Sequence, residues 1–276
     1  MATTKHIHIG CQSWSYDDWV TPPAGDTVFY PHGTKQSEML PLYARLFDTI
    51  EVDSTAYGVP RASTVAGWYE KTPENFRFSL KVPSTITHEL SLRPESYTLI
   101  DEFAGAAAAL GKKLAMILIQ LPASFEASKE NGANFRDFVA RLPKDVPFAV
   151  EFRHAGWFVD WTCEELAAAS VSLALVEGKW VDNEAMFGAV QAAGENAYIR
   201  IMGERDLAHF DRIYRDRQET LSQWADLIKG LDSQKVFVYI DNYFEGHAPA
   251  TANKLKDLLG IPAVSPETLE DQPSLF

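Results

Sequence analysis

The sequence has few cysteines, and none has the spacing of a metal site. Its 276 residues include only Cys11 and Cys163, and neither belongs to a Cys-x-x-Cys pair. This excludes a disulfide framework and a cysteine-based zinc ribbon, and it favours a reducing compartment. There is also no His-Glu-x-x-His motif, so the sequence contains no signal for zinc.

Long apolar runs and an excess of positive charge are also missing. No apolar stretch approaches the roughly 20 residues needed to cross a bilayer. The first residues, MATTKHIHIG, lead directly into an apparent strand, so no signal peptide is visible and we expect a cytoplasmic protein. The net charge of −13 argues against a protein that coats nucleic acid nonspecifically. Local nucleic-acid binding stays open, because the charge of a pocket can differ from that of the whole protein.

A short apolar strand, a polar loop and a segment with helical periodicity alternate along the chain. Eight strands are expected, at His6–Cys11, Thr49–Thr55, Phe76–Val82, Leu114–Leu121, Pro147–Arg153, Val171–Val176, Ala197–Met202 and Lys235–Asp241. The helices expected between them include Gln36–Leu46, Pro94–Leu110, Asn134–Leu142, Thr162–Ala169, Gln218–Lys229 and Ala250–Leu259. The connection between the sixth and seventh strands is poorly marked and is expected to hold only a short helix.

Strands that are nearly continuous runs of Val, Ile, Leu and Phe, alternating with helices, are typical of a parallel sheet buried on both faces. Eight such units favour a closed α/β barrel, the (βα)8 TIM barrel, over an open doubly wound sheet. A Rossmann fold is the alternative, but the first turn reads GCQSWS and lacks Gly-x-Gly-x-x-Gly. We therefore predict one barrel domain over residues 1–264, followed by a mobile acidic tail over residues 265–276.

Polar residues inside the predicted strands point to the barrel interior. Side chains alternate along a strand, so residues two positions apart share a face. In the second strand Glu51 and Asp53 alternate with apolar residues, which predicts that both carboxylates face inward. Glu151 and Arg153 repeat this pattern in the fifth strand. Other polar residues at or near the carboxyl ends of strands are Lys81, Gln120, Arg200 and Asp241.

The carboxyl ends of the strands are where barrel enzymes assemble their catalytic groups. Because an isolated buried charge is costly, so many charges must be paired, hydrated or functional. We interpret them as a charged, enzyme-like pocket. The alternative is a structural salt-bridge network that fills the barrel, for example between Glu151 and Arg200.

The loops at the same end supply aromatic rings, histidines and arginines. Aromatic faces beside carboxylates suit stacking on sugars or nucleobases, although large rings also pack over a barrel mouth. Histidines there would move protons, although single histidines are more often structural. The loop after the seventh strand is locally basic and would suit a phosphate, or form a salt-bridged surface, through Arg205, Arg212, Arg215 and Arg217.

No cofactor is evident from the sequence, and metal binding stays open. The inward carboxylates would hold Mg²⁺ or Mn²⁺ through oxygen. The candidate ligands are Glu51, Asp53, Glu151 and Asp241.

Several of these segments together resemble one protein family, that of domain of unknown function 72 (YecE-like proteins). The matching stretches are IGCQSWSYDDW, FDTIEVDSTAYGVP, FRFSLKVPSTITHE, ILIQLPASF, AVEFRHAGW, AYIRIMG and VYIDNYFEGHAPATA. The resemblance implies a TIM barrel, in agreement with the strand pattern, and it brings no established reaction. The motif residues that it carries over by position are Trp14, Glu51, Asp53, Tyr57, Lys81, His88, Gln120, Glu151, Arg153, His154, Trp157, Arg200, Asp241 and Asn242.

Three functions remain open. The first is an enzyme, a hydrolase, lyase or isomerase, that acts on a sugar-like or phosphorylated metabolite by acid–base catalysis. Its predicted catalytic residues are Glu51, Asp53, Lys81, His88, Glu151, His154 and Asp241. Its predicted substrate-binding residues are Trp14, Tyr57, Gln120, Arg153, Trp157, Arg200, Asn242 and His247. The second is a DNA-processing protein that takes a flipped or single-stranded nucleotide, analogous in fold to endonuclease IV. The third is a ligand-binding barrel without catalysis.

The end of the chain resembles the pentapeptide by which bacterial proteins bind the sliding clamp, usually Gln-Leu-Ser/Asp-Leu-Phe. Here it reads Gln272-Pro273-Ser274-Leu275-Phe276, with Pro273 in place of the usual Leu. Leu275 and Phe276 would enter a hydrophobic pocket of the clamp, with Gln272 and Ser274 at its edge. Ordering such a tail lowers its affinity, so we expect modest binding. The alternative is a polar tail with no partner.

We predict that the purified protein binds a bacterial sliding clamp and that removing residues 272–276 abolishes the interaction. Surface plasmon resonance on immobilised clamp compares the two chains. Tail-dependent binding would favour the DNA-processing function. Equal signals from both chains would remove the tail as a recruitment element.

Overall fold

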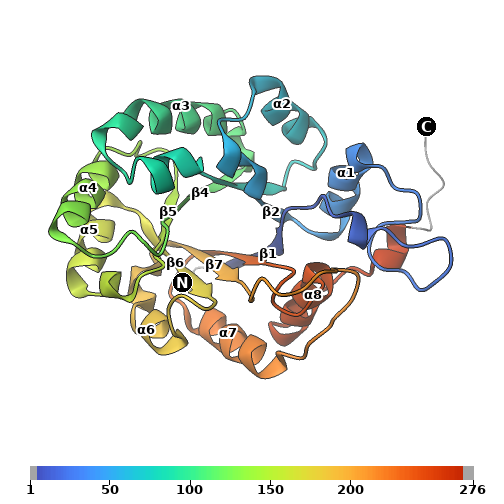
Figure 1. Cartoon of the computed structure of the whole chain (residues 1–276). Helices are drawn as coiled ribbons and strands as arrows, with labels where there is room; N and C mark the ends of the chain where they lie inside the picture. Colours follow the sequence, from blue (N-terminus) through green and yellow to red (C-terminus); the bar gives the residue numbers. More distant parts are fainter. Residues whose placement is uncertain (1–4, 270–276) are drawn as a thin grey trace.

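The computed structural model describes residues 5–269. Eight parallel strands close into a barrel in chain order, and a ring of helices surrounds them (Figure 1). The strands are β1 (His6–Gln12), β2 (Thr49–Val52), β3 (Arg77–Lys81), β4 (Leu114–Gln120), β5 (Phe148–Glu151), β6 (Ser172–Glu177), β7 (Asn196–Ile201) and β8 (Lys235–Ile240). The predicted (βα)8 barrel is thereby confirmed.

One α-helix follows each strand along the chain, and each buries one face on the barrel. In the helix after β7, for example, buried residues recur at positions 221, 224, 225 and 228, the spacing of an amphipathic helix. The helices are α1 (Gln36–Leu46), α2 (Ala62–Glu70), α3 (Tyr97–Ala108), α4 (Lys129–Ala140), α5 (Asp160–Ala169), α6 (Asn183–Gly188), α7 (Gln218–Gly230) and α8 (Ala248–Leu258). As expected, the connection between β6 and β7 holds a short helix, α6. No helix among residues 5–269 is long and apolar enough to span a membrane.

Short helical turns occupy parts of the loops, and one of them shortens the predicted second strand. They are η1 (Asp17–Trp19), η2 (Asp53–Tyr57), η3 (Thr85–Glu89), η4 (Pro94–Ser96), η5 (Gly111–Lys113), η6 (Ala155–Trp157), η7 (Val190–Ala193) and η8 (Pro266–Leu269). Asp53 therefore begins the turn η2 instead of ending β2. In η8 Leu269 is buried, and the carbonyl of Thr268 accepts a hydrogen bond from Arg45 Nη2 at 3.3 Å. Residues 266–269, predicted as tail, thus pack on the barrel, and the pentapeptide 272–276 lies outside the described residues.

Hydrogen-bonded tyrosines fill much of the barrel lumen. The Tyr239 hydroxyl lies 3.0 Å from Thr49 Oγ1 and 2.7 Å from Ser79 Oγ, so three strands meet at one oxygen. The Tyr198 ring packs on Tyr239 with 5.1 Å between ring centroids. Buried polar groups are stable only when they are paired, so these hydrogen bonds and the ring contact hold the two tyrosines in place below the charged end of the barrel.

Two junctions of the barrel are short. β1 registers with β2 only at Cys11–Ile50 and Gln12–Glu51, and β5 registers with β6 only at two positions. At the first junction the Tyr43 hydroxyl of α1 adds two hydrogen bonds that link β1 to β2. Its hydroxyl accepts from the Cys11 N–H at 2.8 Å and donates to the Thr49 carbonyl at 3.0 Å. This bridge sets Gln12 beside Glu51 at the charged end of the barrel.

The same junction leaves no room for a side chain at Gly10. A Cβ there would lie 2.1 Å from the Thr49 carbonyl oxygen and 2.8 Å from the Tyr43 hydroxyl. We predict that Gly10→Ala destabilises the protein by about 3 kcal/mol, since strand backbone cannot give way as a flexible side chain can. Urea unfolding followed by circular dichroism measures the change.

Gly105→Ala is the matched control for Gly10→Ala. Gly105 lies within α3, and a Cβ there would meet nothing within 4 Å. Alanine favours the helix, so this variant should gain about 0.5–1 kcal/mol. A Gly10→Ala protein as stable as wild type would contradict the close approach of β1 and β2.

Candidate functional site

A single guanidinium organises the carboxyl end of the barrel. Arg200 of β7 reaches across the lumen and binds Glu51 of β2 in a bidentate pair, with Nη2–Oε1 at 2.8 Å and Nε–Oε2 at 3.0 Å. Its Nη1 donates to Glu151 Oε2 of β5 at 2.5 Å. All three side chains are buried. The predicted inward orientation of both glutamates is what lets one arginine hold them.

Neutral and charged donors occupy the other oxygen positions of the two glutamates. The Tyr198 hydroxyl donates to Glu51 Oε2 at 2.6 Å. Gln120 Nε2 and Arg153 Nε donate to Glu151 Oε1 at 3.1 Å and 2.7 Å. Burial alone would raise the pKa of Glu151, but Arg200, Arg153 and these hydrogen bonds outweigh it and lower the pKa to about 2.

Lys81 and Asp53 lie at the rim of this network. Lys81 ends β3 and Asp53 begins η2 after β2, and Nζ lies 3.5 Å from Oδ1. The lysine side chain is 14% exposed and the aspartate 44% exposed, so both groups border solvent. Burial and the Arg200 charge lower the pKa of Lys81, while Asp53 and the two glutamates oppose that shift.

Asp241, which follows β8, completes the rim. Gln12 lies between Asp241 and Arg200, donating to Asp241 Oδ2 at 3.3 Å and accepting from Arg200 Nη2 at 3.1 Å. Burial raises the pKa of Asp241, against the opposing effects of the Tyr243 N–H at 3.0 Å and of Arg200. Tyr16 lies in the same electrostatic neighbourhood, because burial and the charges of Asp241 and Asp53 raise its pKa.

His88 joins this cluster from the turn η3 after β3. It is exposed, and its Nδ1 lies 2.8 Å from Thr87 Oγ1. Partial burial and the positive charges of Lys81 and Arg153 lower the pKa of His88. Cations therefore gather toward β3 and β5, while the acids Asp53 and Asp241 lie toward β2 and β8. We call this set the mouth cluster, and its members are Gln12, Tyr16, Asp53, Lys81, His88, Arg153 and Asp241.

Three predicted aromatic contacts lie elsewhere. Trp157 is buried between Phe125 and Phe152, with centroid distances of 5.3 Å and 4.8 Å and nearly parallel planes. Both of its faces are covered, which corrects its predicted stacking role. Trp14 packs edge-on against Trp68 and lines a hollow between α1 and α2. Tyr57 ends η2 and is 91% exposed.

Three further predicted residues have structural partners. Asn242 Oδ1 accepts from Trp19 Nε1 at 3.2 Å and from the Ala248 N–H at 2.9 Å, which joins loops after β1 and β8. His247 is buried against Trp19, and burial lowers its pKa to about 4. His154 Nδ1 accepts from the Gly156 N–H at 3.2 Å and caps η6. Asn242 also forms a side-chain hydrogen bond with Tyr16 of the mouth cluster.

The predicted carboxylate ligands do not fit a divalent cation. Every oxygen of Glu51 and Glu151 already accepts from a cation or a neutral donor. Among residues 5–269 there is no group of three or more His, Cys, Asp or Glu side chains arranged to hold a metal.

Two arginines of the basic loop after β7 have acidic partners. Arg215 pairs with Asp206 at 2.8 Å, and Arg217 lies 3.3 Å from Glu177 at the end of β6. Burial raises the pKa of Glu177 to about 7, with Arg217 opposing the shift. These pairs correspond to the salt-bridged alternative for this loop.

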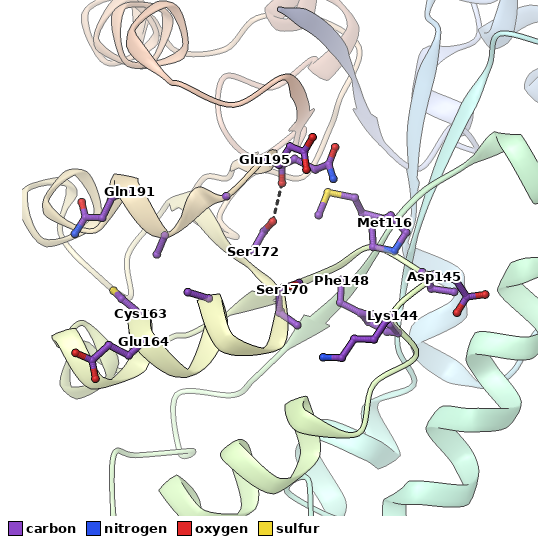
Figure 2. A pocket seen from close by; sticks show the side chains of 17 residues that line it. Met116, Lys144, Asp145, Phe148, Cys163, Glu164, Ser170, Ser172, Gln191 and Glu195 are labelled. Atoms are coloured by element: carbon purple, nitrogen blue, oxygen red, sulfur yellow. Dashed lines mark hydrogen bonds between the residues drawn. The ribbon is translucent and has the colours of Figure 1, made fainter.

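A further hollow lies at the opposite end of the barrel. It measures about 670 Å³ and lies beside α5 and the beginnings of β5, β6 and β7 (Figure 2). Two of its polar side chains are turned to the backbone: Lys144 Nζ donates to the Ala169 carbonyl and Ser172 Oγ to the Asn196 carbonyl, each at 2.8 Å. The amino ends of barrel strands serve stability, so the mouth cluster is the better candidate site.

Comparison with known proteins assigns the family. The profile of the family described as "Protein of unknown function DUF72" matches residues 8–274. The chain belongs to this family. It is 26% identical to UPF0759 protein YunF of Bacillus subtilis, over 92% of this chain and 95% of that protein. It is 28% identical to UPF0759 protein YecE of Escherichia coli K12, over 79% and 82% of the two chains.

Solved DUF72 structures have the same fold. A DUF72 protein from Thermotoga maritima aligns with a TM-score of 0.76 at 24% identity, covering 92% of this chain and 99% of that one. One from Enterococcus faecalis aligns with a TM-score of 0.70 at 22% identity, covering 94% and 100%. The family resemblance predicted from the motifs is confirmed, and these two structures establish the barrel alone.

Sequence reasoning missed Gln12 and Tyr198 as members of this site. Gln12 ends β1 as Gln120 ends β4, and Tyr198 lies two residues before Arg200 on the same face of β7. The alternation that identified Glu51 would have found both. Trp180, whose ring lies 5.7 Å from the Arg153 guanidinium, had no such signal, because it lies in the loop after β6.

Glu151→Gln tests the buried network through its pH dependence. The ordinary pKa of 4.5 falls to about 2 in the folded protein, so the stabilisation is complete above pH 4.5 and is lost as pH falls toward 2. We predict that Glu151→Gln is less stable than wild type by on the order of 3 kcal/mol at pH 7. That difference should shrink steadily between pH 4.5 and pH 2.5. Urea denaturation at several pH values measures it.

The exposed Glu102→Gln in α3 is the control for side-chain chemistry. Its stability should stay close to that of wild type at every pH. A Glu151→Gln deficit that is independent of pH would show that the Glu151 charge contributes nothing to folding.

Proposed function

We propose that this protein is an enzyme that transfers protons on a small polar metabolite, as an isomerase or lyase, at the mouth cluster. The observation that carries the proposal is a pair of titrating groups whose pKa values are moved toward neutrality at one site. Lys81 is shifted downward and Asp241 upward, and Arg200 and Asp53 act electrostatically on both. Acid–base catalysts gain from such shifts because each group can then give or take a proton near neutral pH.

The buried network supports this chemistry without taking part in it. Glu151 was a predicted acid or base, but a carboxyl with a pKa of about 2 and two guanidinium partners is a poor proton carrier at neutral pH. Glu51 is enclosed in the same way by Arg200 and Tyr198. Their contribution is to hold Arg200, and with it the field felt by Lys81 and Asp241. We therefore assign proton transfer to Lys81 and Asp241 at the rim.

The distribution of charge at the rim favours a sugar-like or phosphorylated substrate. Lys81, His88 and Arg153 would face the anionic end, and the positive charges of Lys81 and Arg153 already lower the pKa of His88. Asp241 and Gln12 offer an acid and an amide to the hydroxyl or carbonyl end. A molecule with an anion at one end and oxygen functions at the other would match both sides.

Asp241→Asn tests this function directly. We expect wild type to exchange or rearrange C–H protons of aldose and ketose phosphates, followed by proton NMR in D₂O, and the variant to lose at least about 100-fold in kcat. The reaction needs a neutral Lys81 and a protonated Asp241, and the two conditions are best met together at intermediate pH. This gives a bell-shaped profile, whose falling limb depends on Asp241.

Asp226→Asn, on the exposed face of α7, is the control and should keep full activity. Asp241→Asn must also retain the circular dichroism spectrum of wild type. If folded Asp241→Asn turns over a substrate as fast as wild type, Asp241 is not the acid of this reaction.

A further inference from the structure

We propose that Lys81 acts as a nucleophile that forms an imine with the carbonyl group of its substrate. The substrate class is then an aldehyde or ketone, such as an open-chain sugar. This inference rests on the function proposed above and adds a covalent step to it.

The position of Lys81 is fixed through its backbone. Thr55 of η2 donates its hydroxyl to the Lys81 carbonyl at 2.7 Å and accepts from the Lys81 N–H at 3.1 Å. Asp53 begins the same turn. The amine and its neighbouring carboxylate are therefore held in one local unit, as a nucleophile and its proton acceptor need to be.

The surroundings of Lys81 differ from those of a structural buried lysine in the same chain. Lys113 donates to the Tyr69 carbonyl at 2.6 Å, to the Thr72 carbonyl at 2.7 Å and to Thr72 Oγ1 at 3.2 Å. All three donors of its ammonium are thus satisfied. For Lys81 the ion-pair partner within residues 5–269 is Asp53, at 3.5 Å, beyond an ordinary hydrogen bond.

Desolvation lowers the pKa of both lysines, but three acceptors stabilise the ammonium of Lys113, whereas Lys81 has the Asp53 carboxylate at 3.5 Å. A largely buried ammonium is destabilised by desolvation, and the Arg200 guanidinium adds repulsion. The downward direction of the Lys81 pKa agrees with this geometry. A neutral lysine at the rim of a pocket is the form that attacks carbonyl carbon.

The groups of the mouth cluster can supply and accept every proton that imine formation requires. The Nζ lone pair forms the C–N bond as the carbonyl π electrons move to oxygen. That oxygen takes a proton from Asp241, and the nitrogen gives one to Asp53. The nitrogen lone pair then breaks the C–O bond, and the hydroxyl leaves as water with the proton from Asp53. The products are water, an iminium cation on Lys81 and the Asp241 carboxylate.

The step leads directly to isomerase or lyase chemistry. The Asp241 carboxylate can accept a proton from the carbon next to the iminium, whose C–H electrons then form a C=C bond and neutralise the nitrogen. Return of that proton to a different position isomerises the substrate. Breaking of a C–C bond next to the iminium would instead release a fragment.

Reductive trapping tests the imine on the wild-type protein. Glycolaldehyde or dihydroxyacetone is added with sodium cyanoborohydride at pH 7, and peptide mass spectrometry follows the adduct on each lysine. We expect Lys81 to be labelled at least about tenfold faster than Lys229, which is 52% exposed, because an amine held beside a proton acceptor attacks a carbonyl faster than an isolated surface amine. Lys113 should stay unlabelled. The ratio of Lys81 to Lys229 should become smaller as pH rises, because the lowered pKa of Lys81 gives it less advantage there.

Lys229→Arg is the matched control, since it removes the reference site and should leave labelling of Lys81 unchanged. If Lys81 is labelled no faster than Lys229 at pH 7, the imine is overturned, whether the amine is charged or inaccessible. The proposed function then stands or falls separately on the proton exchange lost in Asp241→Asn. Rapid labelling of Lys81 together with full activity in Asp241→Asn would keep the nucleophile and remove Asp241 as the acid.

Discussion

The pairing of Arg200 with Glu51 and Glu151 is the constraint on which the carboxyl end of this barrel depends. Three charges are removed from water there, and they are tolerable only because every carboxylate oxygen has a donor at hydrogen-bond distance. Removal of any one partner would leave an uncompensated charge in the lumen. The three side chains therefore form a fixed, buried charged layer, and its electrostatic field acts on the residues at the rim.

This charged layer helps to explain why the pKa values of Lys81 and Asp241 at the rim are shifted. Arg200 disfavours the ammonium of Lys81 and favours the carboxylate of Asp241, while burial disfavours the charged form of each. For Lys81 the two effects add, and for Asp241 burial prevails. A site of this kind separates the scaffold, which keeps its charges fixed, from the groups that exchange protons. The fold places both at the end of the barrel where strands and loops meet.

The barrel itself could be predicted from the sequence, because eight apolar strands with intervening helices admit few other architectures. Two-residue alternation also placed Glu51, Glu151 and Arg200 in the lumen. It could not decide which of them would pair, since that depends on which strands face each other across the barrel. Residues in loops were harder still. Trp157 lies sandwiched between two phenylalanines, and His247 is enclosed against Trp19, because loop packing has no sequence period. The same limit left the partners of Lys81 and Asp241 to be found in three dimensions.

The two short junctions of the sheet divide the barrel into halves, β2–β5 and β6–β1. Glu51 and Glu151 belong to the two border strands of the first half, and Arg200 belongs to the second. The Arg200 guanidinium thus links the two halves of the barrel, whose strands pair at only two positions at each junction. Under mechanical or thermal load the molecule would part along these seams before any single half unravels. The ionic contact that shapes the site would then also be the one that holds the two halves in register.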